Sequence, residues 1–289
     1  MIRLVFKSLQ KSEQDILDDL QSRVNAEGNF SARAAKAQSL WDTKGGSKGK
    51  AAFMVLRDTL FDMCVFTGLC NYCEQSEAND IEHIYPKSFY PAYAFNWENY
   101  ILACKQCNSG HKLDKVYIID PRDELLELVR GNEPTHPRIA FINPRMEDPK
   151  NFMLLNPLTF KFEVFNYISK QDQKKGEGTL KILELNERDT LLAARRSAAI
   201  HYYEMLDRLN RLQASSTKNE LEALLTPYDS RFDMNKTLEE LKSDIFNSFK
   251  KYISTYQHPS VWETIKLVQS KMDTKWIRMF EQIPDALNW

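Results

Sequence analysis

The sequence lacks any long hydrophobic run. Its start, MIRLVFKSLQKSEQD, contains no apolar stretch of signal-peptide length, and no later segment approaches the length of a membrane span. We therefore expect a cytoplasmic protein that does not enter a membrane. Cysteine is also scarce, because five cysteines in 289 residues are too few for a disulfide scaffold. Internal repeats and low-complexity tracts are absent too, which argues against a solenoid or a disordered chain.

The chain has almost no net charge. It carries 39 basic and 40 acidic residues, for a formal charge of −1. Domains that bind nucleic acid tightly on their own are often strongly basic, so this balance argues against independent, tight DNA binding. A local basic patch, or a partner that supplies part of the binding surface, remains compatible with it. With 43% hydrophobic residues, the chain is long enough for one large globular domain or two modest ones.

The hydrophobic pattern predicts helices at both ends of the chain. In residues 1–63, apolar residues recur at helical spacing, and the basic segment Lys44 to Lys50 (KGGSKGK) between them predicts a flexible loop. Residues 179–289 form a helical C-terminal region, in which Asn186 is the expected N-cap of a helix that runs through HYYEMLDRLNRL.

The middle of the chain is less regular. Residues 64–120 hold the paired cysteines and most of the candidate chemistry, and they form the expected catalytic core. Residues 121–178 predict an irregular connection with short strands. Two apolar runs around Asn156-Pro157 suggest a hairpin there, and Gly176 to Gly178 suggests a break. The expected fold class is α+β and mostly helical.

Four of the five cysteines fall in two C-x-x-C pairs about thirty residues apart, Cys70/Cys73 and Cys104/Cys107. Each pair places two thiolates on a tight turn, so the four together predict a tetrahedral Cys₄ zinc site. A segment this short cannot bury a core of its own, and zinc would supply much of its folding energy. Unrelated thiols or a redox pair are the alternative. Cys64 stands apart in an apolar run and is expected to be a buried small hydrophobe.

Between the pairs the chain reads DIEHIYPKSFYPAYAFNWENYILACKQCNSGHK. Residues 68–115 resemble the HNH (ββα-metal) endonuclease family with Cys₄ zinc support. Order, spacing and residue type agree at the acidic residue and histidine, at the proline and serine after them, at a central asparagine, and at the asparagine and lysine after the last cysteine. In this sequence these residues are Glu82, His83, Pro86, Ser88, Asn99, Asn108 and Lys112.

The resemblance implies a phosphodiester hydrolase that acts on nucleic acid, with DNA the expected substrate. It makes His83 the general base, Asn99 the residue that orients it, and Glu82 and Asn108 the ligands of a catalytic Mg²⁺ or Mn²⁺. The chemistry is consistent, since histidine titrates near neutrality and hard oxygen ligands suit these ions. The alternative for His83 is a histidine that is merely buried in the core.

One departure from the family spacing leaves the second metal ligand open. An extra residue separates Asn108 from Lys112, and His111 is therefore an alternative to Asn108 as ligand. On an α-helix, residues three apart share a face, so spacing alone does not choose between them. Lys112 and Lys115 are candidates for contact with a phosphate, or else they are merely solvated.

Weaker features outside the core resemble the nuclease subunits of Septu-type anti-phage systems (PtuB-like subunits). These features are a helical N-terminal arm, the segments IIDP and FINPR, and a leucine-rich segment from Leu180 to Arg195. The resemblance implies an ATPase partner that supplies specificity and activation. Two alternatives remain, a non-catalytic Cys₄ module that binds nucleic acid or protein, and an interaction subunit whose helical parts carry the function.

Overall fold

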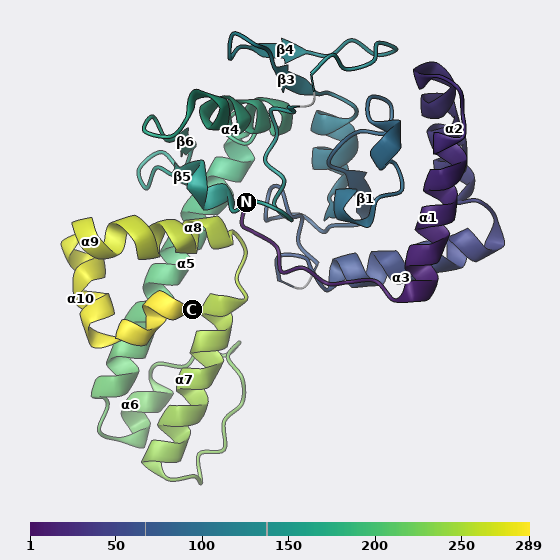
Figure 1. Ribbon diagram of the computed structural model, residues 1–289. Helices are drawn as coiled ribbons and strands as arrows, with labels where there is room; N and C mark the ends of the chain where they lie inside the picture. The colour runs from purple at the N-terminus through teal and green to yellow at the C-terminus, as the bar shows by residue number, and fades with distance from the viewer. Residues whose placement is uncertain (67, 137) are drawn as a thin grey trace. The chain divides into compact units, whose positions relative to one another are not determined.

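The computed structural model describes residues 1–66, 68–136 and 138–289 (Figure 1). Thr67 and Pro137, which fall in the predicted catalytic core and the predicted connection, lie outside the described residues. The chain divides into two compact units. The first comprises Met1–Leu154 with Lys161–Leu191, and the second comprises Leu155–Phe160 with Leu192–Trp289. Within the described ranges, no helix is both long and apolar enough to cross a membrane.

Three helices open the first unit, as predicted: α1 (Lys11–Asn25), α2 (Phe30–Thr43) and α3 (Ser47–Phe61) (Figure 1). The predicted loop at residues 44–50 is much shorter than expected, because α3 already begins at Ser47. Gly45 and Gly46 both have positive φ and form a tight turn after Lys44. A Cβ at Gly49 would lie 1.6 Å from the Lys44 carbonyl oxygen, so the glycines allow close packing here rather than flexibility.

The centre of the first unit is a short antiparallel pair of strands, β1 (Asp80–His83) and β2 (Tyr100–Ala103), with Glu82 opposite Ile101 and His83 opposite Tyr100. All four residues of β2 are buried. A π-helix, η3 (Gln106–Lys112), follows directly. Two 3₁₀ turns, η1 (Pro91–Tyr93) and η2 (Trp97–Asn99), lie in the connection between the strands. Two strands followed by a helix is the ββα arrangement expected for this core.

The remainder of the first unit covers this core. It consists of the hairpin β3 (Tyr117–Ile119) and β4 (Leu125–Glu127), the 3₁₀ turn η4 (Pro149–Asn151), strands β5 (Met153–Leu155) and β6 (Phe162–Val164), and helix α4 (Lys170–Leu183). Strands β5 and β6 pair, which confirms the predicted hairpin. The predicted break at Gly176 to Gly178 is wrong. Both glycines lie inside α4, where a Cβ at Gly178 would meet the Ala140 carbonyl at 2.2 Å.

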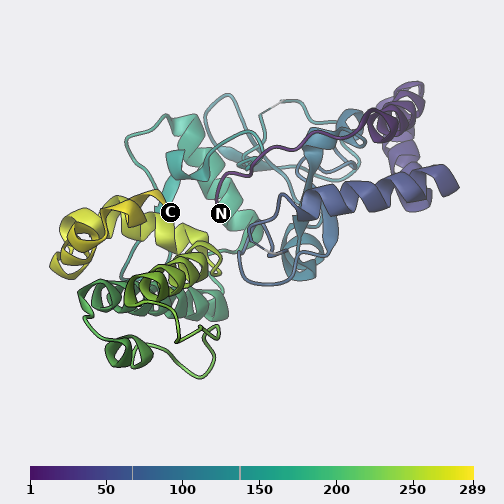
Figure 2. The same ribbon diagram turned by 90° about the horizontal axis from the view of Figure 1, so that it is seen from below.

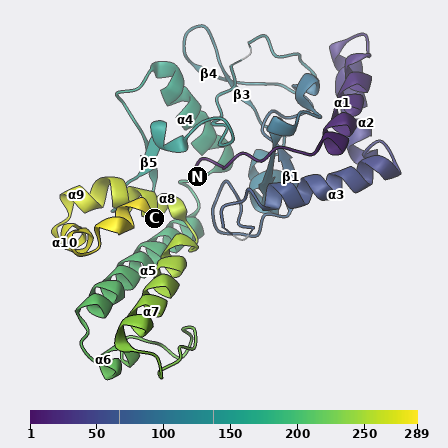
Figure 3. The same ribbon diagram turned by 60° about the horizontal axis from the view of Figure 1, so that its bottom comes forward.

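The second unit is helical, as predicted for the C-terminal region. Its elements are α5 (Asp189–Ala214, whose first residues belong to the first unit), α6 (Lys218–Glu222), α7 (Leu238–Ser254), α8 (Pro259–Thr264), η5 (Ile265–Gln269), α9 (Ser270–Met272), α10 (Thr274–Gln282) and η6 (Pro284–Asn288). Helices α5 and α7 run alongside each other in Figures 2 and 3. Buried Tyr202, Phe249 and Trp262 fill the core of this unit.

Asn186 is not the N-cap that the sequence predicted, because α5 begins three residues later at Asp189. Its side chain instead accepts a hydrogen bond from the Phe162 backbone N–H (2.8 Å) and donates one to the Phe162 carbonyl (2.9 Å). Asn186 therefore extends β6 with a side-chain amide. The fold class is α+β and mostly helical, as predicted.

Candidate active site and metal centre

The two cysteine pairs meet in a single cluster. The Sγ atoms of Cys70, Cys73, Cys104 and Cys107 all lie within 4.8 Å of one another, and all four residues are buried. The Sγ atoms of Cys73 and Cys104 are 3.9 Å apart. A tetrahedral zinc ion with Zn–S bonds of about 2.3 Å separates its sulfurs by roughly 3.8 Å. The four thiols therefore fit a structural zinc ion without rearrangement of the backbone.

Polar contacts around the cluster suit charged sulfurs. The Cys107 backbone N–H points at Cys104 Sγ (3.4 Å), and Arg188 donates to Cys107 Sγ (3.4 Å) and to Gln106 Oε1 (3.0 Å). Burial opposes the charge of Arg188, but its hydrogen bond to Cys107 and the nearby thiolates outweigh that and raise the pKa of Arg188. Such second contacts hold metal ligands in place. The sequence gave no reason to single out Arg188, which lies 81 positions after Cys107.

Cys64 lies outside the cluster, as predicted. It is half-buried, which differs from the fully buried position expected. Its sulfur accepts a hydrogen bond from Asn71 Nδ2 (3.5 Å). Burial raises the pKa of Cys64 to about 11, so the thiol stays protonated and uncharged at neutral pH.

His83 ends β1 and is buried at 5% exposure. Its Nε2 lies 2.9 Å from the Ala94 carbonyl oxygen, which only accepts, so Nε2 carries the proton and Nδ1 keeps a lone pair. The ring also packs edge-on against Trp41 of α2 at 4.2 Å. Burial, reinforced by the charge of Lys87, holds the pKa of His83 well below its usual range. The imidazole is thus neutral at neutral pH and equipped to accept a proton.

Asn99 lies behind His83 and holds the connection that follows it. Its Oδ1 accepts from the Tyr85 N–H (2.7 Å), and its Nδ2 donates to the carbonyls of Tyr85 (2.9 Å) and Tyr93 (2.8 Å). Its own carbonyl accepts from the Ile84 N–H (2.9 Å). These hydrogen bonds fix the backbone at both ends of a loop that starts beside His83.

Glu82 is also buried, at 4% exposure, and forms an ion pair with Lys112. Lys112 is 1% exposed and donates a further hydrogen bond to the His83 carbonyl (2.7 Å). Burial raises the pKa of Glu82, and Lys112 opposes that shift. The ammonium thus keeps a carboxylate available inside the protein. Lys112 is accordingly an internal partner of Glu82, whereas Lys115 is exposed.

Asn108 and His111 are the two candidates for the second metal ligand. Because η3 is a π-helix and not an α-helix, residues three apart on it do not share a face. Its wide turn bonds the Leu113 N–H to the Asn108 carbonyl, five residues apart (2.6 Å). The residue that follows Asn108 around such a turn is therefore Lys112, and His111 points elsewhere. His111 Nδ1 lies 3.2 Å from Glu184 at the end of α4, while Asn108 Nδ2 donates to Asp80 of β1 (3.2 Å).

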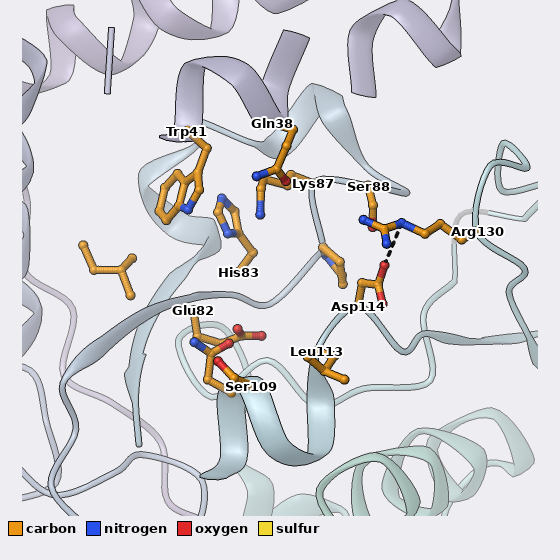
Figure 4. Close-up of a pocket in the computed structure, with 13 residues that line it drawn as sticks. Gln38, Trp41, Glu82, His83, Lys87, Ser88, Ser109, Leu113, Asp114 and Arg130 are labelled. Atoms are coloured by element: carbon orange, nitrogen blue, oxygen red, sulfur yellow. Dashed lines mark ion pairs between the residues drawn. The ribbon is translucent and has the colours of Figure 1, made fainter. Parts of the chain in front are cut away.

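A cavity of about 330 Å³ brings these groups together. Figure 4 shows His83 directed toward α2 on one side of the strand and Glu82 directed toward the π-helix on the other. Asn108 borders the cavity, while His111, Asn99 and Lys115 do not. The remaining walls come from residues far apart in the sequence, namely Gln38, Trp41, Ile81, Pro86, Lys87, Ser88, Ser109, Leu113, Asp114 and Arg130.

Several cavity residues escaped the sequence analysis. Gln38 and Trp41 come from α2, and Arg130, which pairs with Asp114 (3.2 Å), comes from the segment after β4. Lys87 follows Pro86 in the motif, and burial lowers its pKa. Among the described residues Lys87 has no carboxylate within ion-pair distance; its ammonium lies 5.6 Å from the centre of the Trp41 ring. The position of Lys87 directly after Pro86 was the one feature of the sequence that could have indicated that it lines the cavity.

Residues 70–112 match the family model described as HNH endonuclease. The chain is also similar to a Septu protein PtuB of Bacillus thuringiensis, with 28% identity over 147 residues (48% of this chain, 45% of the relative). A Septu protein PtuB of Bacillus mycoides (strain KBAB4) is 26% identical over 212 residues (67% of this chain, 66% of the relative). The chain thus spans less than two thirds of either relative, and no solved structure matches it. The segment with both cysteine pairs and His83 is therefore an HNH endonuclease domain, within a chain similar to the Septu PtuB proteins.

Proposed function

We propose that this protein is a metal-dependent endonuclease that hydrolyses phosphodiester bonds, with DNA as its substrate. One observation carries the proposal. A neutral, buried histidine with its Nδ1 lone pair available borders the same open cavity as a carboxylate, an amide and a lysine that forms no ion pair among the described residues. This set supplies what hydrolysis of a phosphodiester requires, namely a base, oxygen ligands for a cation and positive charge for the phosphate.

Each residue has a defined task in this proposal. His83 Nδ1 accepts a proton from the attacking water, while the Ala94 carbonyl holds the ring in the required tautomer. Glu82 and the Asn108 side-chain oxygen hold a Mg²⁺ or Mn²⁺ ion, which stabilises charge on the phosphate and the leaving oxygen when bound. Lys87 contacts a phosphate oxygen. Asn99 is a positioning residue that fixes the backbone after His83.

The four cysteines hold zinc in this proposal and take no part in the reaction. Thiolates prefer zinc, whereas the oxygen donors at the cavity suit Mg²⁺ or Mn²⁺, so the two sites are not expected to exchange metals. The zinc ion fixes the start of η3, because Cys104 and Cys107 lie at that end of the helix. Asn108, the residue after Cys107, depends on the same turn for its position.

We further propose that the protein acts in anti-phage defence with an ATPase partner. The named relatives are Septu proteins, and their similarity to this chain extends well beyond the HNH segment. The near-zero net charge agrees with a nuclease whose grip on nucleic acid is partly supplied by another subunit. Affinity purification of the full chain from its native cells, followed by mass spectrometry, tests this. Recovery of no nucleotide-hydrolysing partner, together with full activity of the isolated chain, would contradict it.

The catalytic proposal is tested by nicking of plasmid DNA with the His83→Ala variant. We expect at least the ~10²–10⁴-fold loss that follows removal of a positioned acid–base group. Zinc content serves as a control and should match the parent protein, since the zinc ligands are the four cysteines. Circular dichroism at the assay temperature shows that the variant is folded, because loss of the buried His83 ring lowers its thermal stability. EDTA should stop cleavage, and Mg²⁺ or Mn²⁺ should restore it. If the folded variant cleaves as fast as the parent, the catalytic proposal is wrong and a non-catalytic zinc module replaces it.

A further inference from the structure

A second cavity lies in the first unit, on the other side of the loop that follows His83. Its volume is about 340 Å³, similar to that of the catalytic cavity. Five of its twelve lining residues are phenylalanine or tyrosine, namely Phe30, Tyr85, Phe89, Tyr90 and Tyr93. Arg33 of α2 also lines it. The proposed reaction uses none of these side chains. We therefore ask which ligand this second cavity could bind.

One loop separates the two cavities. Pro86, Lys87 and Ser88 line the catalytic cavity, while Tyr85 before them and the aromatic residues after them line the second one. Asn99 fixes this loop at both ends through the Tyr85 and Tyr93 backbones. Because His83 and Tyr85 are two residues apart, their Cα atoms are separated by at most about 7 Å. A strand whose phosphate lies beside His83 and Lys87 therefore has its neighbouring sugar and base within reach of the second cavity.

The side chains of the second cavity suit a flat ring with polar edges. The Tyr85 and Tyr93 rings are inclined by only 31° with centres 5.3 Å apart, and Tyr93 is 45% exposed, so much of this side chain is accessible to a ligand. Tyr90 is only 9% exposed, and its buried hydroxyl has no hydrogen-bond partner among the described residues. Buried hydroxyl groups usually find a partner, so this one is available to a ligand.

Arg33 is held in place without an acidic partner. Its Nε donates to the Glu27 carbonyl (3.0 Å), and no carboxylate among the described residues forms an ion pair with it. Its guanidinium therefore remains available to stack on a base or to contact a phosphate. Glu133 also lines this cavity and is exposed, and its negative charge disfavours a phosphate inside the cavity but not a neutral base.

We propose that this second cavity binds an unpaired nucleobase next to the scissile phosphate, stacked on Tyr93. This inference rests on the proposed nuclease function and narrows it. A base held in a duplex stacks on its neighbours and cannot also enter this cavity. The preferred substrate is therefore single-stranded at the cleavage point, or a duplex whose base is bulged or turned out of the helix.

The test measures binding with the full-length His83→Ala protein in Mg²⁺, so that cleavage does not interfere. The probes are a thymidine or uridine homopolymer and a sugar–phosphate chain of the same length without bases. Tyr93→Ala in this background should weaken homopolymer binding roughly tenfold, the typical effect of losing one stacked base. It should leave the weaker binding of the base-free chain unchanged. Tyr93→Phe, which keeps the ring, should bind like the parent.

Controls separate stacking from general damage. Tyr228→Ala, at a tyrosine that is 95% exposed in the second unit, should change neither probe. Equal weakening of both probes by Tyr93→Ala, equal binding of homopolymer and base-free chain by the parent, or no homopolymer binding at all would each overturn the inference. If the wild-type chain nicks DNA but one of these results is found, only the base cavity is wrong. If His83→Ala still cleaves, the nuclease function itself fails and this inference with it.

Discussion

The two candidate metal sites beside the π-helix η3 differ in how their ligands are arranged. At the start of η3, the cysteine cluster presents four identical, buried ligands within 4.8 Å of one another, and a tetrahedral ion would leave no position vacant. The cavity that we propose to be catalytic presents the Glu82 carboxylate, the Asn108 amide and His83 around an open volume of about 330 Å³. A saturated site holds the chain together, whereas an unsaturated one leaves room for water and substrate.

The difference also appears in how each site treats charge. At the cysteine cluster, the Cys107 N–H and the Arg188 guanidinium donate to two of the four sulfurs, which favours their charged form. In the cavity, Lys112 forms an ion pair with Glu82, whereas Lys87 forms no direct ion pair among the described residues. Substitutions at the first site should therefore change stability, and substitutions at the second should change activity. Each of the following predictions tests whether the cysteine cluster determines stability and the cavity determines activity.

The largest effect is expected for Cys107→Ser. Losing one of four thiolates should release zinc and unfold the segment between the cysteine pairs, because structural zinc binding contributes on the order of 10–16 kcal/mol in small domains. Elemental analysis and circular dichroism measure this. Cys64→Ser is the matched control and should keep its zinc, since Cys64 lies outside the cluster. A folded, zinc-free and active Cys107→Ser protein would remove the distinction between the two sites.

Asn108→Ala should come next. The folded protein should keep its zinc but need roughly 10–100-fold more Mg²⁺ or Mn²⁺ for half-maximal cleavage, since the site has few oxygen ligands. His111→Ala should leave the metal requirement nearly unchanged, because His111 faces Glu184 and does not border the cavity. Titration of each ion in the nicking assay separates the two. The reverse ranking would make His111 the ligand and our choice of Asn108 wrong.

Arg188→Met should have a smaller effect, confined to the cysteine cluster. Without its hydrogen bond to Cys107, the zinc should dissociate roughly tenfold more readily, in line with other residues that support metal ligands. Competition with a chromogenic chelator measures this. Arg196→Met is the control, since Arg196 is exposed and contacts no cysteine in the described structure. An altered Mg²⁺ requirement with unchanged zinc affinity would show that Arg188 acts on the cavity instead.

Lys87→Met should shift the pH dependence of cleavage. The reaction needs neutral His83, so activity falls as the pH drops through the His83 pKa. Burial lowers that pKa and the charge of Lys87 lowers it further. Removing that charge raises the His83 pKa, and the acidic limb should therefore move to higher pH. Rates at saturating metal across mildly acidic pH measure this, with Lys115→Met as an exposed control. A shift to lower pH, or none, would contradict the assignment of Lys87.

Much of the core could be predicted because its signals are local. The spacing of the cysteines predicted a single cluster, and the strand–strand–helix order followed from the motif around Glu82, His83 and Asn108. The roles of those three residues remain predictions that the assays above test. The hairpin around Asn156-Pro157 was also local, since two short apolar runs flank a turn.

Features that depend on distant contacts could not be predicted. Trp41 packs on the His83 ring from a helix 42 positions earlier, and nothing in its own surroundings indicates this. Asn186 has the local sequence pattern of an N-cap, but its side-chain amide forms hydrogen bonds with the Phe162 backbone instead. Glycines were misread for a related reason. Gly49 and Gly178 permit close approach to carbonyl groups that lie elsewhere in the fold, whereas the sequence alone suggested flexibility and a break.

The wide turn of the π-helix η3 accommodates one residue more than an α-helical turn would. A π-turn can be regarded as an α-turn that has gained one residue, and the resemblance to HNH endonucleases predicts one residue fewer between the last cysteine and the lysine than this chain has. The insertion would ordinarily displace everything downstream by a third of a turn. By absorbing it within η3, the chain keeps Lys112 at Glu82 and directs the additional side chain, His111, outward to α4. The wider turn thus lets one more residue enter the chain without separating Lys112 from Glu82, and in our proposal it leaves Asn108 rather than His111 at the cavity.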